Sequence, residues 1–287
     1  MPRMSESPCQ TPMEHTVVIV GVGLIGGSLA AALRDRNAVN RIIGVGRDAG
    51  RLNQARAVGL IDEISTDLSQ SAPLADVIVF CTPVDRVAEG VRLASAYARP
   101  GTLLTDAGSV KQPICDALAD IADFVGSHPI AGSHRQGFEA ADAQLFEGRL
   151  CVLTPLPSNT ATQIDRLDRF WKGVGMRTTR MSPSDHDRAL AMTSHLPHVV
   201  AAALARTLVS ENRPLTGTGF RDTTRIAAGD PELWTGILLQ NAQHVADGIE
   251  SVQQQLREFQ DALSSGNADR IRQLLVDGQQ QRSALDC

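Results

Sequence analysis

A glycine-rich turn near the start of the chain limits the fold more than any other feature of the sequence. It lies between a short apolar run at 17–20 and an Ala/Leu-rich stretch at 24–36, and its glycines have the spacing GxGxxG: Gly21, Gly23 and Gly26. The first glycine permits a tight turn, the second lets a pyrophosphate approach the backbone, and the third lets helix and strand pack closely. Because a helix N-terminus attracts anions, this unit predicts a dinucleotide-binding site that includes Leu24 and Ile25.

The position about 20 residues past the third glycine selects between NAD and NADP in such units. The chain has Gly46 and then Arg47 there, where NAD-binding units carry an acid. Gly46 leaves room for a 2′-phosphate and the Arg47 guanidinium can pair with it, so we expect NADP, or use of both cofactors. A solvated arginine at the start of a loop is the alternative. We add Thr82 and Pro83, which directly follow the apolar run at 76–81, to the expected cofactor-binding residues.

Short apolar runs alternate with helical segments through the first half of the chain. Strands are expected at 17–20, 41–45, 76–81, 102–105, 150–153 and 176–180, and helices at 24–36, 48–58, 112–119 and 158–172. Wholly apolar strands are typical of parallel sheets covered on both faces, and strands separated by helices join by right-handed crossovers. The pattern predicts an α/β fold, with a Rossmann-like, doubly wound parallel sheet.

The second half has a different pattern. After residue 182, long Ala/Leu/Val-rich stretches show helical periodicity and almost no strand pattern. A length of 287 residues is typical of about two domains. We expect a flexible tail at 1–15, a dinucleotide-binding domain at 16–181 and an all-α domain at 182–287. Only 3% of the residues are aromatic, so the interiors are expected to be built from Ala, Val, Leu and Ile.

Composition excludes several other classes of protein. No apolar run approaches the ~18–20 residues of a membrane helix, and the first residues lack the apolar core of a secretory signal. A net charge of −5 without any Lys/Arg block argues against nucleic acid as the main ligand. Five cysteines without a CxxC pair indicate neither a disulfide framework nor a zinc site. We therefore expect a cytoplasmic protein that binds neither nucleic acid nor a membrane.

Two polar loops are expected where strands of the sheet end, which is where α/β sheets bind ligands. They are DAGSVK at 106–111 and GSHPIAG at 126–132. Imidazole titrates near neutral pH, so His128 is the expected general base, with Ser109 placed to orient it and to bond a substrate hydroxyl. An isolated histidine would more often be structural, but two such loops beside a dinucleotide site favour catalysis.

A further polar cluster interrupts the Ala-rich second half. His198, Asp222 and Arg225 stand in apolar surroundings, where charges are rarely buried without a partner, and the arginine fork suits a substrate carboxylate. A solvated helix start is the alternative for this arginine and aspartate. Zinc is a second alternative, because His195 and His198 could share a helix face; but a proline intervenes and no third ligand has suitable spacing, so no metal is expected.

Taken together, these motifs resemble the prephenate/arogenate dehydrogenases of tyrosine biosynthesis. The resemblance runs from about residue 16 onward and rests on GVGLIGGSL, CTP, DAGSVK, SHPIAGS, LFEGRLCVLTP, TSHLPH and GFRDTTRIAAGDPELW, in family order. The first motif is generic, whereas the last four together are specific. The resemblance implies oxidative decarboxylation of prephenate to 4-hydroxyphenylpyruvate with hydride transfer to NAD(P). It also implies a homodimer formed through the helical domain.

The resemblance also implies a role for each candidate residue. His128 would accept the proton of the ring hydroxyl, and Ser109 would hold that hydroxyl and the histidine in line with the nicotinamide. Arg225 would bind a substrate carboxylate, with His198 and Asp222 lining the pocket.

The sequence departs from the family pattern at His134, where many members carry an acid. The nearby Gln136 is uncharged, which suits the keto group of prephenate better than the amine of arogenate. We therefore favour prephenate as substrate and Gln136 as a substrate-binding residue. An arogenate or dual-substrate enzyme is the alternative.

Two other functions are less compatible with the residues. A 3-hydroxyacid dehydrogenase of the 6-phosphogluconate dehydrogenase type uses a lysine of its helical domain, but residues 173–287 contain no lysine. A non-enzymatic redox sensor that binds a dinucleotide would not need the histidine, serine and arginine together.

Overall fold

The structure is a computed structural model that describes residues 13–132 and 135–286. Its first half is built on a parallel five-stranded sheet with the order β3-β2-β1-β4-β5. The strands are β1 (Glu14–Val20), β2 (Val39–Val45), β3 (Glu63–Ser65), β4 (Val77–Phe80) and β5 (Leu103–Asp106). The predicted Rossmann-like sheet is confirmed. The first strand begins at Glu14, inside the stretch expected to be a tail, and residues 1–12 of that tail lie outside the described residues.

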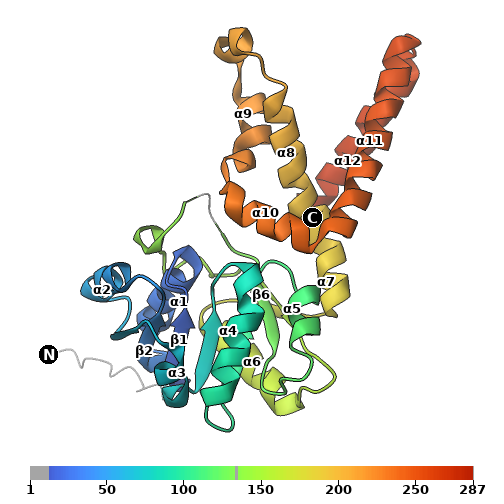
Figure 1. The fold of residues 1–287 in the computed structure, drawn as a ribbon. Coiled ribbons are helices and arrows are strands. Elements are labelled where there is room, and N and C mark those ends of the chain that lie inside the picture. Colours follow the sequence, from blue (N-terminus) through green and yellow to red (C-terminus); the bar gives the residue numbers. More distant parts are fainter. Residues whose placement is uncertain (1–12, 133–134, 287) are drawn as a thin grey trace, which may run out of the picture.

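Helices cover both faces of this sheet (Figure 1). They are α1 (Leu24–Asp35), α2 (Ala49–Ala57), α3 (Leu68–Ser71), α4 (Val84–Tyr97), α5 (Gln112–Ala117) and α6 (Ala161–Gly173), with 3-10 turns η1 (Ala72–Leu74) and η2 (Phe138–Ala140). Successive side chains of a strand face opposite sides of the sheet. Val17 and Ile19 of β1 accordingly pack in one apolar core with α1, and Val18 packs in the other core with α4.

Helix α4 is an element that the sequence pattern did not predict. Its apolar face is narrow, because Val84, Val87, Val91 and Ala94 are buried while most residues between them are charged or small. Such a stripe has the 3.6-residue period of a helix, but it is less conspicuous than the Ala/Leu-rich stretch that forms α1.

A second, three-stranded sheet corrects the expected topology. The strands expected at 150–153 and 176–180 are present as β7 (Leu150–Thr154) and β8 (Arg177–Arg180), but they do not extend the parallel sheet. They join β6 (Gly126–Pro129), which pairs antiparallel with β7 and had been expected to be a loop. This strand is only four residues long and ends in a proline, so its sequence alone resembles a turn.

Aromatic side chains contribute more to the core than composition predicts. Phe146, Phe170 and Trp171 are fully buried, and both phenylalanines contact Trp171 edge to face, with ring centroids 5.5–6.0 Å apart. Edge-to-face packing of this kind adds about 0.5–1.5 kcal/mol beyond area burial. The expectation of wholly aliphatic interiors is therefore wrong, because most of the few aromatic residues are buried in the two cores of the first domain.

The second half of the chain is helical, as predicted. Its elements are α7 (Pro183–Leu190), a π-helical turn η3 (Ala191–His195), α8 (Leu196–Arg206), η4 (Ser210–Leu215), α9 (Thr218–Thr224), η5 (Arg225–Ala228), α10 (Pro231–Gln240), α11 (Ala242–Ser264), α12 (Ala268–Ser283) and η6 (Ala284–Asp286). Helix α7 packs against α5 and β7 of the first domain, and α10 contacts α4. Two branches, α8–α9 and α11–α12, diverge from there away from the sheet (Figure 1).

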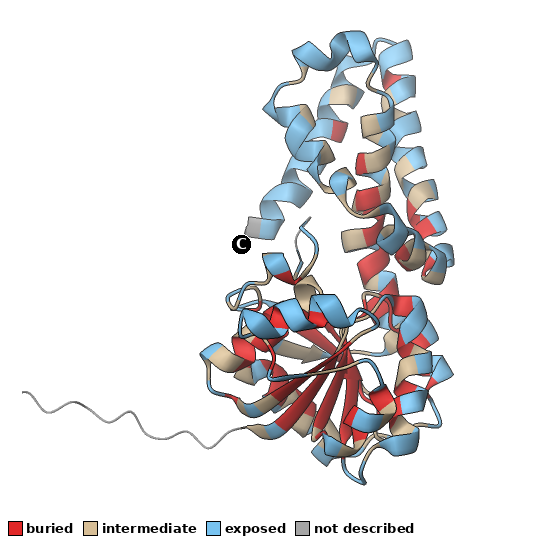
Figure 2. Ribbon diagram, turned by 60° about the vertical axis from the view of Figure 1, so that its left-hand side comes forward, coloured by how far each residue is buried: buried red, intermediate tan, exposed pale blue. Residues whose placement is uncertain are grey.

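Burial is unevenly divided between the two halves. Buried residues fill the sheet and the base of the helical half, whereas the outer parts of both helical branches are mostly exposed (Figure 2). Large apolar side chains are exposed on these branches, including Leu215 at 81%, Leu263 at 64% and Leu256 at 61% exposure. Exposed apolar area of this extent marks an interaction surface. Within the described residues, no helix is both long and apolar enough to cross a membrane.

Candidate active site

The glycine turn lies between β1 and α1 and has the geometry of a dinucleotide cradle. Gly21 has φ +94°, and a Cβ there would lie 2.8 Å from the carbonyl oxygen of Cys81; a Cβ on Gly26 would collide with Gly21. Gly23 has open space instead, because a Cβ there would meet no atom within 4 Å. The buried hydroxyl of Thr82, on the neighbouring strand end, has no hydrogen-bond partner. A tight turn, an open second glycine and an unsatisfied hydroxyl fit the pyrophosphate of a dinucleotide.

Arg47 stands at the carboxyl end of β2, exposed and next to this turn. Among the described residues it has no ion-pair partner. Asp48, one residue later, is occupied as the N-cap of α2, where its side chain accepts from the Arg51 backbone N–H at 3.0 Å. The guanidinium of Arg47 is therefore available to an anionic ligand at the place where a ribose 2′ substituent is expected.

A fully buried ion pair stands behind the second polar loop. Asp106, the last residue of β5, pairs with Lys111, and the exposed fraction of both side chains is 0%. The Lys111 ammonium also donates to the carbonyl of Ser127 at 3.0 Å, and Asp106 accepts from the Ser127 backbone N–H at 3.1 Å. This pair thereby fixes β6 to the end of β5, immediately before His128.

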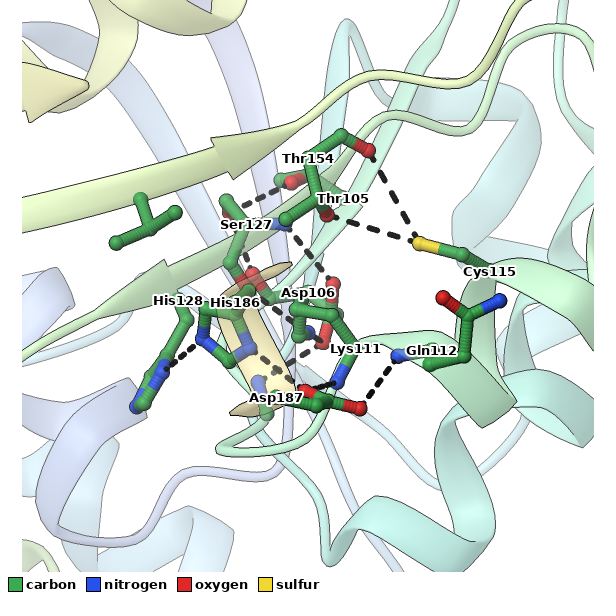
Figure 3. Close-up of polar contacts among 12 residues, drawn as sticks. Thr105, Asp106, Lys111, Gln112, Cys115, Ser127, His128, Thr154, His186 and Asp187 are labelled. Carbon is green, nitrogen blue, oxygen red and sulfur yellow. Dashed lines mark hydrogen bonds and ion pairs between the residues drawn. The ribbon is translucent and has the colours of Figure 1, made fainter. Parts of the chain in front are cut away.

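His128 follows Ser127 in β6 and lies at the same carboxyl edge as the glycine turn, because a parallel bridge aligns the approach to β6 with β5. Its Nδ1 lies 2.8 Å from Nε2 of His186 on α7, and Nδ1 of His186 lies 2.7 Å from a carboxylate oxygen of Asp187. The other edge of the His128 ring points away from this network (Figure 3). Within the described part of the chain, no group forms a hydrogen bond to Nε2 of His128.

Burial lowers the pKa of three histidines of the site. It lowers the pKa of His128 well below the usual 6.5, and the nearby His186, Lys111 and His195 act in the same direction. Burial also lowers the pKa of His195 to about 4, although Asp187 opposes that shift, and it lowers the pKa of His198. A neutral imidazole can accept a proton at physiological pH.

A second polar chain links this network to the helical half. The side-chain amide of Asn241 donates to the Asp187 carbonyl at 2.7 Å and lies 3.1 Å from Nδ1 of His195. Among the described residues, Nε2 of His195 and Nδ1 of His198 are buried without a hydrogen-bond partner. The His198 ring stacks on Trp234, with centroids 3.6 Å apart. Buried polar atoms without partners are rare, so a bound water or ligand is expected here.

Ser109, Gln136 and His134 are the other residues of the first domain that the sequence singles out near the site. Ser109 is half-buried in the loop after β5, but among the described residues no hydrogen bond joins it to His128. Gln136 reaches across to the helical half and donates to Asp230, the N-cap of α10, at 3.0 Å. His134 lies outside the described residues.

Arg225 and Asp222 lie on the α9–η5 branch and are exposed in the single chain, despite the apolar sequence around them. The physical reason is the open arrangement of the helical half, in which α9 has no packing partner on its outer side (Figure 1). His198 alone among the second-domain candidates is buried, at 7% exposure.

Sequence reasoning missed His186, Asp187, Asn241 and Trp234 and assigned no role to Lys111. The segment SPSDHDR looks like the solvated first turn of a helix, and only the packing of α7 against α5 and β7 buries its His186 and Asp187. A His-Asp pair directly after the predicted domain boundary was the one available signal. Among the described residues, no group of three or more His, Cys, Asp and Glu side chains is arranged to hold a metal.

Comparisons with known proteins agree on one family. Residues 29–180 match the model of the prephenate dehydrogenase nucleotide-binding domain, and residues 182–277 match that of the prephenate dehydrogenase dimerization domain. A prephenate dehydrogenase of Bacillus subtilis is 35% identical over 82% of this chain and 66% of its own length. A cyclohexadienyl dehydrogenase of Zymomonas mobilis is 31% identical over 96% of this chain and 97% of its own length.

A solved structure has the same architecture throughout. The prephenate dehydrogenase of Aquifex aeolicus, crystallised with hydroxyphenyl propionate and NAD+, is 32% identical and superimposes with a TM-score of 0.89, covering 94% of this chain and 98% of the other. The chain belongs to the prephenate dehydrogenase family and is an NAD(P)-dependent prephenate/arogenate dehydrogenase, an oxidoreductase.

Proposed function

We propose that the chain oxidises prephenate, that His128 is its general base, and that the reaction releases carbon dioxide and 4-hydroxyphenylpyruvate. The observation that carries this proposal is the His128 imidazole. Burial keeps it neutral, one ring nitrogen is held by His186, and the other has no protein partner at the edge where the cofactor turn lies. A general base needs a free lone pair facing the substrate, and this ring provides one.

The proposed reaction follows from that lone pair. Nε2 of His128 takes the proton of the ring hydroxyl while the carbinol carbon loses its hydrogen as hydride. Bound NAD(P) supplies the hydride acceptor. The bond between the ring and its carboxylate then breaks, its electron pair makes the ring aromatic, and the phenol oxygen recovers the proton from His128. The half-buried Ser109 is the proposed second contact of the substrate hydroxyl.

The substrate carboxylates need a cation, and Arg225 is the proposed anchor, with His198 and Asp222 lining the pocket. In the single chain Arg225 is exposed, as are the apolar side chains of both helical branches. We propose that the branches of two subunits pair as a homodimer. This pairing covers the exposed apolar side chains and lowers the local dielectric constant around the Arg225 guanidinium. A bidentate arginine–carboxylate pair is stronger in such surroundings.

Replacement of Arg225 by alanine is expected to raise the KM for prephenate by roughly 10- to 100-fold, because a charge-assisted hydrogen bond contributes about 1.5–3 kcal/mol. The turnover number should change less, since Arg225 binds a group that does not react. Steady-state assays of cofactor reduction measure both. Arg221→Ala, four residues earlier on the same exposed branch, is the matched control. A KM for prephenate that Arg225→Ala leaves unchanged removes the proposed anchor.

Prephenate rather than arogenate is the proposed substrate because of the surroundings of Gln136. The one carboxylate that Gln136 contacts, Asp230, is already occupied: one oxygen caps α10 at the Glu232 N–H, at 2.9 Å, and the other accepts from Gln136 at 3.0 Å. A carboxylate committed in this way is poorly placed to hold the amine of arogenate. Use of both substrates is the second candidate, which the cyclohexadienyl dehydrogenase of Zymomonas mobilis favours.

NADP is the proposed cofactor, with Arg47 holding its 2′-phosphate; NAD, which is bound in the Aquifex aeolicus structure, is the alternative. Arg47→Ala is expected to raise the KM for NADP by about 10-fold or more and to leave that for NAD nearly unchanged, because only NADP carries the phosphate. Arg51→Ala is the matched control, since Arg51 pairs with Glu139 at 3.1 Å. A preference for NAD that Arg47→Ala does not alter contradicts this assignment.

The reaction is proposed to take place in the cytoplasm. The thiols of Cys81, Cys115 and Cys151 are free, which suits a reducing compartment.

A further inference from the structure

We propose that His186 and Asp187 are positioning residues that hold His128 in one tautomer, with its proton on Nδ1 and its lone pair on Nε2. This inference rests on the proposed role of His128 as the base. It explains why the nitrogen that faces the substrate is able to accept a proton, which burial alone does not.

The argument begins at Asp187, whose side chain is 98% buried beside His186. Its carboxylate accepts from the backbone N–H of Lys111 at 2.7 Å and from that of Gln112 at 2.8 Å. A carboxylate that takes two such bonds has only acceptor sites left to offer. Nδ1 of His186, 2.7 Å from the same carboxylate, must therefore carry a hydrogen.

The second step passes from His186 to His128. A neutral imidazole has one N–H and one lone pair, so a proton on Nδ1 of His186 leaves its Nε2 as an acceptor. The group 2.8 Å from that Nε2 is Nδ1 of His128, which must then donate. By the same rule, Nε2 of His128 carries the lone pair.

The chain of hydrogen bonds from Asp187 through His186 to His128 is called the relay below. It is rigid because each of the three residues is held by a different part of the fold. The side chain of His186 is fully buried. Asp187 is fixed from the start of α5 by the two backbone N–H groups, and from the helical half by Asn241, which donates to its carbonyl. The orientation of the His128 ring thus depends on the seating of α7 between the two halves.

The groups around His128 decide how well it can carry the positive charge that it gains when it accepts the substrate proton. Lys111 and the rings of His186 and His195 disfavour a positive charge on His128, and the ammonium of Lys111 is itself neutralised by Asp106. A protonated His128 still donates from Nδ1 to His186, whose own N–H points at the Asp187 carboxylate. The carboxylate therefore stabilises the cation through one intervening ring without touching it.

A nitrogen-15 spectrum of the histidine rings in the ligand-free enzyme tests the tautomer directly. His128, assigned by comparison with the His128→Asn protein, should show a protonated Nδ1 and an unprotonated Nε2 near neutral pH. The reverse pattern, produced if His186 is itself an imidazolium that donates to His128, overturns the proposal whatever the kinetics show. The spectrum needs only the wild-type fold and a variant used for assignment.

Two substitutions test whether the enzyme uses the relay. His186→Leu removes the acceptor for the His128 N–H and should lower kcat by about 100-fold with little change in the KM of the cofactor. His186→Gln offers a side-chain oxygen to the same N–H and should recover most of that loss. A packing role predicts no advantage of Gln over Leu. Equal activity of the two variants, or wild-type activity of His186→Leu, contradicts the relay.

Failure of the relay and failure of the proposed function are distinguishable. If His128→Asn abolishes turnover but the ring shows the reversed tautomer, His128 is the base and the relay is wrong. If His128→Asn retains turnover, the proposed function itself fails.

Discussion

His128→Asn is expected to lower kcat by about 10²- to 10⁴-fold, which is the usual contribution of a general base. Asparagine keeps a polar group of similar size but cannot accept the hydroxyl proton. The affinity for the cofactor should hardly change, because the glycine turn and Thr82 follow strands of the five-stranded sheet, whereas His128 lies on β6 of the three-stranded sheet. Turnover and cofactor binding are measured separately, by steady-state kinetics and by titration of protein fluorescence.

The pH dependence of the wild-type enzyme gives an independent check on this base. The active form of His128 is neutral, and burial lowers its pKa well below 6.5. As pH falls, kcat/KM should therefore stay constant through 6.5 and decline only below it, where His128 becomes protonated. An acid limb at or above 6.5, or a variant with unchanged turnover, is incompatible with the proposed role.

Lys111→Met is expected to cost about 3–5 kcal/mol of unfolding free energy, the largest stability effect of any single substitution considered for this chain. Methionine fills a similar volume, but it leaves the Asp106 carboxylate buried without its counter-ion and removes the donor to the Ser127 carbonyl. Urea denaturation followed by circular dichroism measures the change. Where a second transition from the helical half is visible, the loss should fall on the transition of the first domain.

The chain offers a matched control, since Lys172 is its only other lysine. Its side chain is 56% exposed, and its ammonium pairs with Asp168 at 2.8 Å on the surface of α6. Surface pairs contribute about 0–1 kcal/mol, so Lys172→Met should be nearly neutral. If both substitutions lowered the free energy of unfolding equally, the buried pair would stabilise the contact between β6 and β5 no more than a surface pair does.

The parts of the fold that the sequence predicts are those with local causes. The glycine turn, the apolar strands and the Ala-rich helices each follow from residues within one short segment, and the structure has them. The second sheet does not follow in this way. Whether 126–129 is a loop or a strand depends on its pairing with Leu150–Thr154, which no local pattern encodes.

The same difference between local and long-range causes separates the site residues that the sequence predicts from those that it does not. His128 could be identified because its imidazole precedes a proline in a polar loop that is expected where a strand of the sheet ends. His186 and Asp187 could not, because their burial depends on α7 packing against α5, whose starting residues are more than 70 positions away in the chain. The role of Arg225 was inferred from its chemistry alone, but its exposure is set by the partners of α9, which among the described residues are mainly α8 and η5.

The most direct test of the account is an assay of the purified wild-type protein with prephenate and with arogenate, each against NAD and NADP. We expect prephenate with NADP to give the highest kcat/KM, with equal amounts of reduced cofactor, carbon dioxide and 4-hydroxyphenylpyruvate. Absence of cofactor reduction with both prephenate and arogenate, together with reduction by a 3-hydroxyacid, would contradict it.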